Sequence, residues 1–476
     1  MQPNILWICT DQQRFDTLGC YGNSFVRTPN INRLAENGVL FENVYCQSTI
    51  CSPSRTSFLT GRYPRTTKCM QNGQNISENE VLISRLLSEA GYTCGLSGKF
   101  HLSACHPSVS KGMERRINDG YDLFHWSHHP GEDWPVNEYS NWLRSKGKRY
   151  KPEKITECNH VVYGPDAEDH QATWCTDKAI EFMEAHENKQ QPWLFSVNIF
   201  APHHPFDPPK SYLKRYLDIL DDILEPNYVE GELYDKPEVQ KRDHRGAYAN
   251  PNLYPYCNMS DLDHKYTRAA YWAMCDLIDD QVGRMMETLE KTGQLENTIV
   301  IFMSDHGELL GDHGIYLKGP HFYEESVHVP LIISYPEKIK ENKRESALVE
   351  LIDLAPTLLE AAGIDKYPGM QGKSLWPLIQ GEEHNHREDV YCEVNEARVV
   401  GNTLGNGSMI RTKSHKLVVH QGKNEGELYD LESDPTETIN LWNSKEHLHM
   451  KYEMMERLTR RLIDMTDPLP PKIAPW

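Results

Sequence analysis

The sequence contains no apolar run that approaches the roughly 18 residues of a bilayer-spanning helix. Hydrophobic residues make up 38% of the 476 positions and charged residues 25%, a composition typical of a globular protein with no membrane partner. The first residues, MQPNILWICTDQQ, lack the basic start of a signal peptide. As written, the chain is expected in the cytoplasm; if a signal peptide was removed, it would be periplasmic or secreted.

An excess of basic residues is also missing, since the formal net charge is −19. This charge argues against nucleic acid or an anionic membrane surface as a partner. If the substrate is an anion, a local cationic pocket has to capture it.

Paired cysteines of the zinc or redox type are absent as well. None of the twelve cysteines forms a CxxC motif. Cys9, Cys94 and Cys275 lie in apolar patterns and are predicted to be buried thiols, which suits a reduced compartment.

Four near-continuous apolar runs are present, as expected of parallel strands covered on both faces: NILWICT (4–10), YTCGLSG (92–98), WLFSVNIF (193–200) and TIVIFMS (298–304). Helices are predicted between them. Ser77 and Glu80 suggest a capping box for a helix that Gly91 ends, and a longer helix runs from about Asp263 to Lys291. The alternation predicts an α/β fold with a large, mostly parallel central sheet flanked by helices.

Two segments interrupt this alternation, near residues 103–170 and 205–262. They are predicted insertions, rich in aromatic residues and proline, in a first domain that spans residues 1–381. Short strands and turns follow over residues 382–476. They predict a small C-terminal subdomain with an antiparallel sheet and a helix.

Polar residues follow every apolar run, and the carboxyl ends of parallel strands meet at one edge of a sheet. In chain order they are Asp11 and Gln12, Lys99 and His101, His203 and His204, and Asp305 and His306. Oxygen donors with one imidazole, from Asp11, Gln12, Asp305 and His306, suit calcium, magnesium or manganese better than zinc or copper. Lys99, Arg55 and Lys318 could form the cationic pocket. His101 and His203 could donate protons near neutral pH.

The stretch TICSPSRTSFLTG places Cys51 at the start of a short predicted helix, with Ser52 as N-cap, Pro53 in the first turn and Gly61 at the end. A helix N-terminus favours an anion or a thiolate. A cysteine-type phosphatase, which carries its thiolate in a C-x5-R loop, is therefore one hypothesis. It fails because only three residues separate Cys51 from Arg55.

CSPSR followed by LTG resembles the signature C-x-P-S-R-x3-L-T-G of the formylglycine-dependent (type I) sulfatases in the alkaline phosphatase superfamily. Further similar segments follow in order along nearly the whole chain, among them LSGKFHL, APHHPF, SDHGELLGDHG and YEESVHVPLII. The resemblance implies an alkaline phosphatase-like fold and a sulfuric ester hydrolase. It also implies that a separate maturation enzyme oxidises Cys51 to formylglycine, whose hydrate attacks sulfur.

The resemblance implies a role for each site residue. Asp11, Gln12, Asp305, His306 and the modified Cys51 would bind one divalent metal, with Ca2+ preferred to Mn2+ or Mg2+. Arg55 would hold the formylglycine hydrate, and Lys99 and Lys318 would neutralise the sulfate oxygens. His101 would assist breakdown of the hemiacetal, and His203 would bind substrate and protonate the leaving oxygen.

Asp11-Gln12 and Asp305-His306 depart from the Asp-Asp and Asp-Asn of many sulfatases and resemble choline sulfatases and phosphonate monoester hydrolases. The preferred hypothesis is a sulfatase acting on a sulfated small molecule or glycan, with the sulfate ester of a carbohydrate as the preferred substrate. A phosphonate monoester or phosphodiester hydrolase is the alternative, and a catalytically inactive binding protein is a second. The oligomeric state is left open.

Several other residues invite a functional interpretation. His328 is assigned to structure, and Asp312 and His313 to loop packing rather than a second metal site. For the segment FHWSHHP, two interpretations stay open: a sugar-stacking surface and the anchoring of a surface loop. Its residues are His125, His128 and His129, with Trp126 and Trp134.

Overall fold

The computed structural model describes residues 2–106, 108, 112–131, 134–339, 342–395, 405–421, 425–471 and 473–474. Its centre is an eight-stranded sheet in the order β10-β2-β9-β8-β1-β7-β3-β4. Only β9 runs antiparallel to its neighbours among these strands, so the predicted mostly parallel α/β sheet is confirmed. The strands are β1 (Asn4–Asp11), β2 (Val39–Tyr45), β3 (Thr93–Gly98), β4 (Leu123–Trp126), β7 (Trp193–Pro202), β8 (Thr298–Ser304), β9 (Leu331–Ser334) and β10 (Lys343–Glu350).

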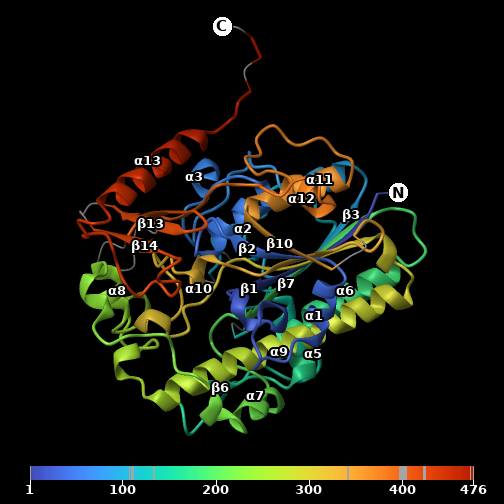
Figure 1. The fold of residues 1–476 in the computed structure, drawn as a ribbon. Helices are drawn as coiled ribbons and strands as arrows, with labels where there is room; N and C mark the ends of the chain where they lie inside the picture. The colour runs from blue at the N-terminus through green and yellow to red at the C-terminus, as the bar shows by residue number, and fades with distance from the viewer. Residues whose placement is uncertain are drawn as a thin grey trace.

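Helices cover both faces of this sheet (Figure 1). One face carries α1 (Pro29–Glu36), α5 (Glu138–Ser145), α6 (Gln171–Ala185), α7 (Lys210–Leu217) and the long α9 (Asp261–Lys291). The other carries α2 (Cys51–Thr60), α4 (Ile83–Glu89), α11 (Leu354–Ala361) and α12 (Trp376–Gln380). Along β1, Ile5 and Trp7 join one core and Leu6 and Ile8 the other, because strand side chains alternate between faces. This two-sided burial explains why the predicted strands are apolar throughout.

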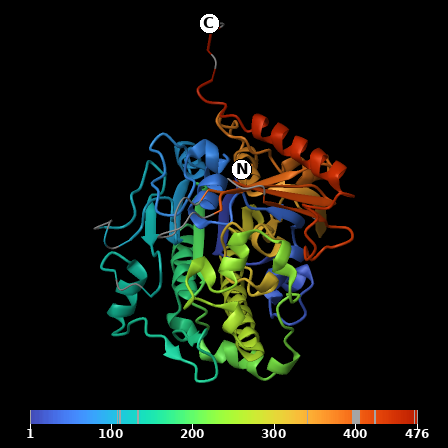
Figure 2. The same cartoon turned by 90° about the vertical axis from the view of Figure 1, so that its left-hand side faces the viewer.

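A second sheet lies beside the first, near α3 (Pro64–Thr67), and is antiparallel (Figures 1 and 2). It consists of β11 (Val390–Val394), β12 (Gly407–Arg411), β13 (His415–His420) and β14 (Gly426–Asp430). The helix α13 (Leu448–Asp464) packs on it through Met454 and Leu458. The antiparallel sheet and helix expected for the C-terminal part are thus present, while the boundary at residue 381 stays a prediction.

The two predicted insertions differ in how they contact the main sheet and its helices. The segment near 103–170, part of which lies outside the described residues, supplies β4 to the edge of the main sheet, together with α5 and the short pair β5 (Glu153–Lys154) and β6 (Val162–Tyr163). It is therefore more than a surface loop. The segment near 205–262 holds α7, α8 (Glu238–Asp243) and several short turns. The remaining short helix is α10 (Glu324–Val327). Across the described residues, no helix is both long and apolar enough to cross a membrane.

Two helix starts differ from their predictions. Ser77 and Glu80 form a turn, and α4 begins only at Ile83 after Leu82, so the predicted capping box is wrong. The long helix α9 begins two residues earlier than expected because Ser260 and Asp263 form a reciprocal capping box.

Candidate active site

The strands β8, β1, β7 and β3 are neighbours in the sheet, so their carboxyl ends lie side by side. This edge brings together the ten residues to which the family resemblance gives a role. Nine of them are buried, and His203 is half-buried. They are Asp11, Gln12, Cys51, Arg55, Lys99, His101, His203, Asp305, His306 and Lys318.

Cys51 is the first residue of α2, and the helix N-cap is Ile50. The prediction that Ser52 caps the helix is therefore wrong, although the position of the thiol at the helix N-terminus is confirmed. Ser54 Oγ donates a hydrogen bond of 2.5 Å to the carbonyl of Asp305, which fixes α2 against the end of β8. The positive end of the helix dipole thus faces the site.

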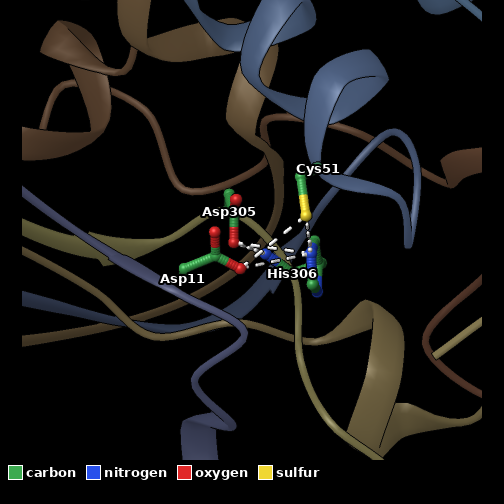
Figure 3. A group of neighbouring side chains, drawn as sticks. All are labelled: Asp11, Cys51, Asp305 and His306. Carbon is green, nitrogen blue, oxygen red and sulfur yellow. Dashed lines mark hydrogen bonds and ion pairs between the residues drawn. The ribbon is translucent and has the colours of Figure 1, made fainter. Parts of the chain in front are cut away.

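The side chains of Asp11, Asp305 and His306 converge around the thiol of Cys51 (Figure 3). One possible ligand atom of each lies within 4.8 Å of the others. Cys51 Sγ is 3.2 Å from His306 Nε2 and 3.7 Å from Asp11 Oδ1. His306 Nε2 is 3.7 Å from Asp305 Oδ1. This compactness is what a single cation requires.

The donor atoms are also oriented toward that point. His306 Nδ1 donates to the carbonyl of Gly307 at 2.9 Å, so the lone pair of Nε2 faces the cluster. Gln12 Nε2 donates to Glu308, which directs the Gln12 carbonyl oxygen inward, 2.7 Å from Lys318 Nζ. The donor set therefore fits a divalent cation that prefers oxygen and imidazole ligands.

Three cationic groups surround the same point. Lys318 Nζ lies 2.9 Å and Lys99 Nζ 3.7 Å from Cys51 Sγ, and Lys99 also pairs with Asp11. Arg55 connects the two carboxylates, with Nε 2.8 Å from Asp305 and a terminal nitrogen 3.4 Å from Asp11. They form the local cationic pocket that the acidic chain as a whole lacks.

These charges control ionisation at the site. Burial opposes ionisation of Cys51, but Lys318, Lys99 and His306 outweigh it and hold the pKa of the thiol well below its ordinary value. Burial and the nearby thiolate likewise oppose ionisation of Asp11. The net shift is nevertheless downward, and Lys99 contributes to holding the pKa of this carboxylate below its ordinary value. Position 51 therefore lies where negative charge is strongly stabilised.

A cavity of about 410 Å3 opens above this cluster. Cys51, Lys99, His101, His203 and Lys318 line its inner end. The remaining lining residues are Ile50, Asn72, Gly73, Cys105, His128, His129, Phe200, His204 and Tyr248. Among the described residues that line it, none is an aspartate or glutamate.

Burial lowers the pKa of all five histidines that line this cavity, which favours their neutral form. Burial and the nearby Lys318 lower the pKa of His203 to about 3. Burial and Lys99 lower the pKa of His129 to about 4. His203 Nδ1 donates a hydrogen bond of 2.6 Å to the carbonyl of His204, so Nε2 is the ring nitrogen that remains for interaction with Cys51 and with a substrate.

Three residues of the cluster and of the cavity have a strained backbone. Gln12, His101 and Tyr248 have φ values of 67°, 57° and 55°, in the left-handed region that non-glycine residues rarely adopt. Each such residue costs about 1–3 kcal/mol, so the surrounding structure has to enforce it.

His328 and Asp312, which the sequence analysis assigns to structural roles, are both packed against other side chains. His328 stacks on Phe15 with ring centroids 3.8 Å apart. Asp312 pairs with Arg14 and Arg268, and this confirms its role in loop packing.

His313 is also a packing residue, since it pairs with Glu232 and Glu325.

The aromatic residues of the FHWSHHP segment and the following Trp134 have different surroundings. Trp126 and Trp134 are buried against each other, so the sugar-stacking interpretation is wrong for them, whereas His128 and His129 line the cavity.

Sequence reasoning missed two buried carboxylates behind the site. Glu308 lies three residues after Asp305 within SDHGELL, so the motif itself contained a signal. Glu114, which binds the backbone of residues 101–103, lies in no motif that the sequence singled out.

Two protein-family models match this chain. A family model described as "Sulfatase" matches residues 3–364. A second model, described as "N-sulphoglucosamine sulphohydrolase, C-terminal", matches residues 311–464.

Individual relatives extend over nearly the whole chain. An arylsulfatase from Clostridium perfringens is 32% identical over 462 residues, which cover 94% of this chain and 92% of that protein. An N-acetylglucosamine-6-O-sulfatase from Bacteroides thetaiotaomicron is 27% identical over 520 residues, covering 96% and 86%. Among solved structures, a phosphonate monoester hydrolase from Silicibacter pomeroyi shares the fold, with a TM-score of 0.84, 23% identity and coverage of 98% and 96%.

Proposed function

This chain belongs to the sulfatase family, and from that membership we propose that it releases inorganic sulfate from a sulfated carbohydrate, using Cys51 in its formylglycine form. The observation that carries the proposal is the position of Cys51. Its side chain lies at a helix N-terminus, 2.9 Å from Lys318 Nζ and 3.2 Å from His306 Nε2, within the sequence CSPSR. An aldehyde formed at this position would supply a geminal diol whose hydroxyl is the nucleophile toward sulfur.

The divalent cation is proposed to bind Asp11, Gln12, Asp305, His306 and the oxidised side chain of residue 51, with Ca2+ preferred. When bound, it supplies positive charge that favours the ionised nucleophile and offsets the charge of the sulfate. Arg55 holds Asp11 and Asp305 in their relative positions through its two contacts. It is also proposed to hold the diol at residue 51.

The sulfate group is proposed to bind between the ammonium groups of Lys99 and Lys318, which both face position 51. Groups that are already in place and charged stabilise the transferring group without reorganisation. His203 is proposed to hold the proton for the leaving oxygen at Nε2. A bound anionic sulfate favours that protonated form, because it opposes the effect of Lys318 on the imidazole. His101 is proposed to take the proton from the second hydroxyl group of residue 51. The loss of this proton re-forms the aldehyde and releases the sulfate.

A carbohydrate is the proposed leaving group for two reasons. The outer cavity presents neutral imidazoles, an amide from Asn72 and the ring of Tyr248, with no carboxylate from the described residues to attract a cationic substrate. A relative across most of the chain carries the name N-acetylglucosamine-6-O-sulfatase. Hydroxyl groups of a sugar suit such hydrogen-bonding and stacking partners.

The direct test compares full-length protein produced with and without a formylglycine-generating enzyme. We expect the peptide that contains Cys51 to show the mass of the aldehyde only in the first sample, and hydrolysis of 4-nitrophenyl sulfate to follow that fraction. Activity that is equal in both samples would refute the formylglycine proposal. Faster turnover of an aryl phosphonate than of the aryl sulfate would replace the sulfatase assignment with phosphonate hydrolysis.

The substrate class needs a separate measurement. A panel of sulfated monosaccharides and disaccharides, with choline sulfate as the non-sugar member, should give the highest kcat/KM with a sugar. A higher kcat/KM with choline sulfate would refute the carbohydrate proposal while leaving the reaction class intact.

A further inference from the structure

The backbone that carries His101 is held by a buried carboxylate that does not line the cavity. Glu114 is 1% exposed and comes from the insertion near residues 103–170. Its Oε1 accepts hydrogen bonds from the backbone N–H of His101 at 2.7 Å and from the indole N–H of Trp126 at 2.9 Å. Its Oε2 accepts from the backbone N–H groups of Leu102 at 2.7 Å and Ser103 at 3.1 Å.

These contacts turn three successive backbone N–H groups toward one carboxylate. Such consecutive N–H groups form a concave anion-binding turn, and hydrogen bonds to an ionised acceptor are stronger than neutral ones. The turn contains His101 at φ 57°, a conformation that a non-glycine residue keeps only when its surroundings require it. Glu114 contributes to that requirement, because a turn that moved away from it would lose the acceptor of three backbone N–H groups.

The same carboxylate is also linked to the imidazole of His101 through the side chains of Trp126 and His128. Trp126, which ends β4, is fully buried and stacks against His128 with ring planes 12° apart. His128 in turn meets the ring of His101 edge to face, at a centroid distance of 4.5 Å. Glu114 therefore holds the backbone of His101 directly. It also holds Trp126 at the end of β4, and Trp126 packs on the His128 ring that contacts His101.

We propose that Glu114 is the positioning residue for His101, holding the 101–103 turn so that the imidazole faces position 51. It acts through His101, since it does not line the cavity. This inference rests on the proposed function, because the residue that it positions is assigned to sulfate release.

The test uses Glu114→Gln in the mature full-length protein. The amide keeps the size of the side chain but places a donor where two N–H groups need an acceptor. We expect kcat for 4-nitrophenyl sulfate to fall about 10- to 100-fold with little change in KM, as for other residues that orient a catalytic group. Asp119→Asn is the matched control. Asp119 is another buried carboxylate of the same insertion, bonded to Arg116 and the Tyr121 backbone, and its variant should keep the wild-type kcat.

A double-mutant cycle separates positioning from general stability. If Glu114 acts through His101, then His101→Ala and the double variant should have the same kcat. A purely structural role would lower kcat by the same factor in both backgrounds and would overturn the proposal. If Glu114→Gln does not fold, Trp126→Phe, which removes the indole donor and part of the ring while keeping an aromatic side chain, is taken through the same cycle with the same two outcomes.

A crystal structure of Glu114→Gln provides a readout that does not depend on activity. We expect His101 to leave the left-handed region and its ring to move away from residue 51. An unchanged turn would overturn the proposal even if kcat fell. Conversely, a wild-type protein without sulfatase activity would refute the proposed function, while the crystallographic result would still decide whether Glu114 positions His101.

Discussion

The side-chain amide of Gln12 donates a hydrogen bond to the buried carboxylate of Glu308. Glu308 also accepts from the backbone N–H groups of Leu310 and Leu317, at 2.9 and 2.5 Å, so the carboxylate cannot rotate freely. As a result, the amide oxygen of Gln12 faces the cluster of Asp11, Asp305 and His306 rather than the protein interior. One buried carboxylate thus decides which end of an amide is presented to the proposed metal.

Glu308→Gln should weaken this orientation, because an amide cannot accept all three hydrogen bonds. We expect activity to fall about 10- to 100-fold, and the Ca2+ concentration for half-maximal activity to rise. A Ca2+ titration of 4-nitrophenyl sulfate hydrolysis measures both. Glu345→Gln is the control, since Glu345 is a buried carboxylate on β10 that accepts from the Ala347 backbone. Equal Ca2+ curves for wild type and Glu308→Gln would contradict the prediction.

Calcium should stabilise the folded chain through Asp305. A ligand that binds only the native state adds about 2.7 kcal/mol to the free energy of unfolding at 100 times its Kd. We expect the Tm of the wild type to rise with Ca2+ and the Tm of Asp305→Asn to stay constant. Asp279→Asn should keep the Ca2+-dependent rise, because Asp279 is buried on α9 and bonded to Asn30 and Ile31. Thermal unfolding with and without a chelator measures the shift; the same rise in Asp305→Asn would rule out this ligand.

Lys318→Ala should remove positive charge directly beside position 51. We expect kcat/KM for an aryl sulfate to fall about 10²- to 10³-fold, as for the loss of one group that stabilises a developing anion. Inhibition by inorganic sulfate should weaken as well. Lys236→Ala is a matched control, because Lys236 is also buried but bonds Tyr429 and the Glu437 carbonyl instead. It should lower stability and leave KM unchanged; a similar KM change in both variants would argue against sulfate binding by Lys318.

His313 should make stability depend on pH above neutrality. Burial opposes its protonated form, but the hydrogen bond to Glu232 and the carboxylate of Glu325, 3.6 Å from Nε2, raise its pKa to about 9. Because the folded-state pKa lies above the unfolded value of about 6.5, the stabilisation is complete below pH 6.5 and is lost as the pH rises through 9. Its size is about 3 kcal/mol from the shift in pKa.

Urea unfolding between pH 6 and 10 tests this prediction. The difference in unfolding free energy between wild type and His313→Gln should shrink as the pH rises. His449→Gln, on the exposed surface of α13, should run parallel to the wild type throughout. A constant difference between wild type and His313→Gln would show that His313 carries no such linkage.

The sequence by itself determined four strands of the central sheet, β1, β3, β7 and β8, and the polar residues that follow them. Continuous apolar runs specify strands covered on both faces, and the polar residues directly after them must meet at the carboxyl edge once the strands are parallel. Cys51 and Arg55 follow from a motif whose spacing is local. These features depend on neighbours within a few residues along the chain, so they can be predicted from the sequence.

Only the tertiary structure decided how the site residues are oriented. Gln12 and Glu308 are 296 residues apart, and no local pattern indicates which amide atom faces the metal ligands. Glu114 and Trp126 lie in a segment predicted as an insertion, yet they fix the turn at His101 because β4 joins the main sheet. Orientation depends on hydrogen-bond partners that only the folded chain brings together, and buried polar groups must find such partners. The sequence therefore specified which groups assemble, and the fold decided which atoms of them face the substrate.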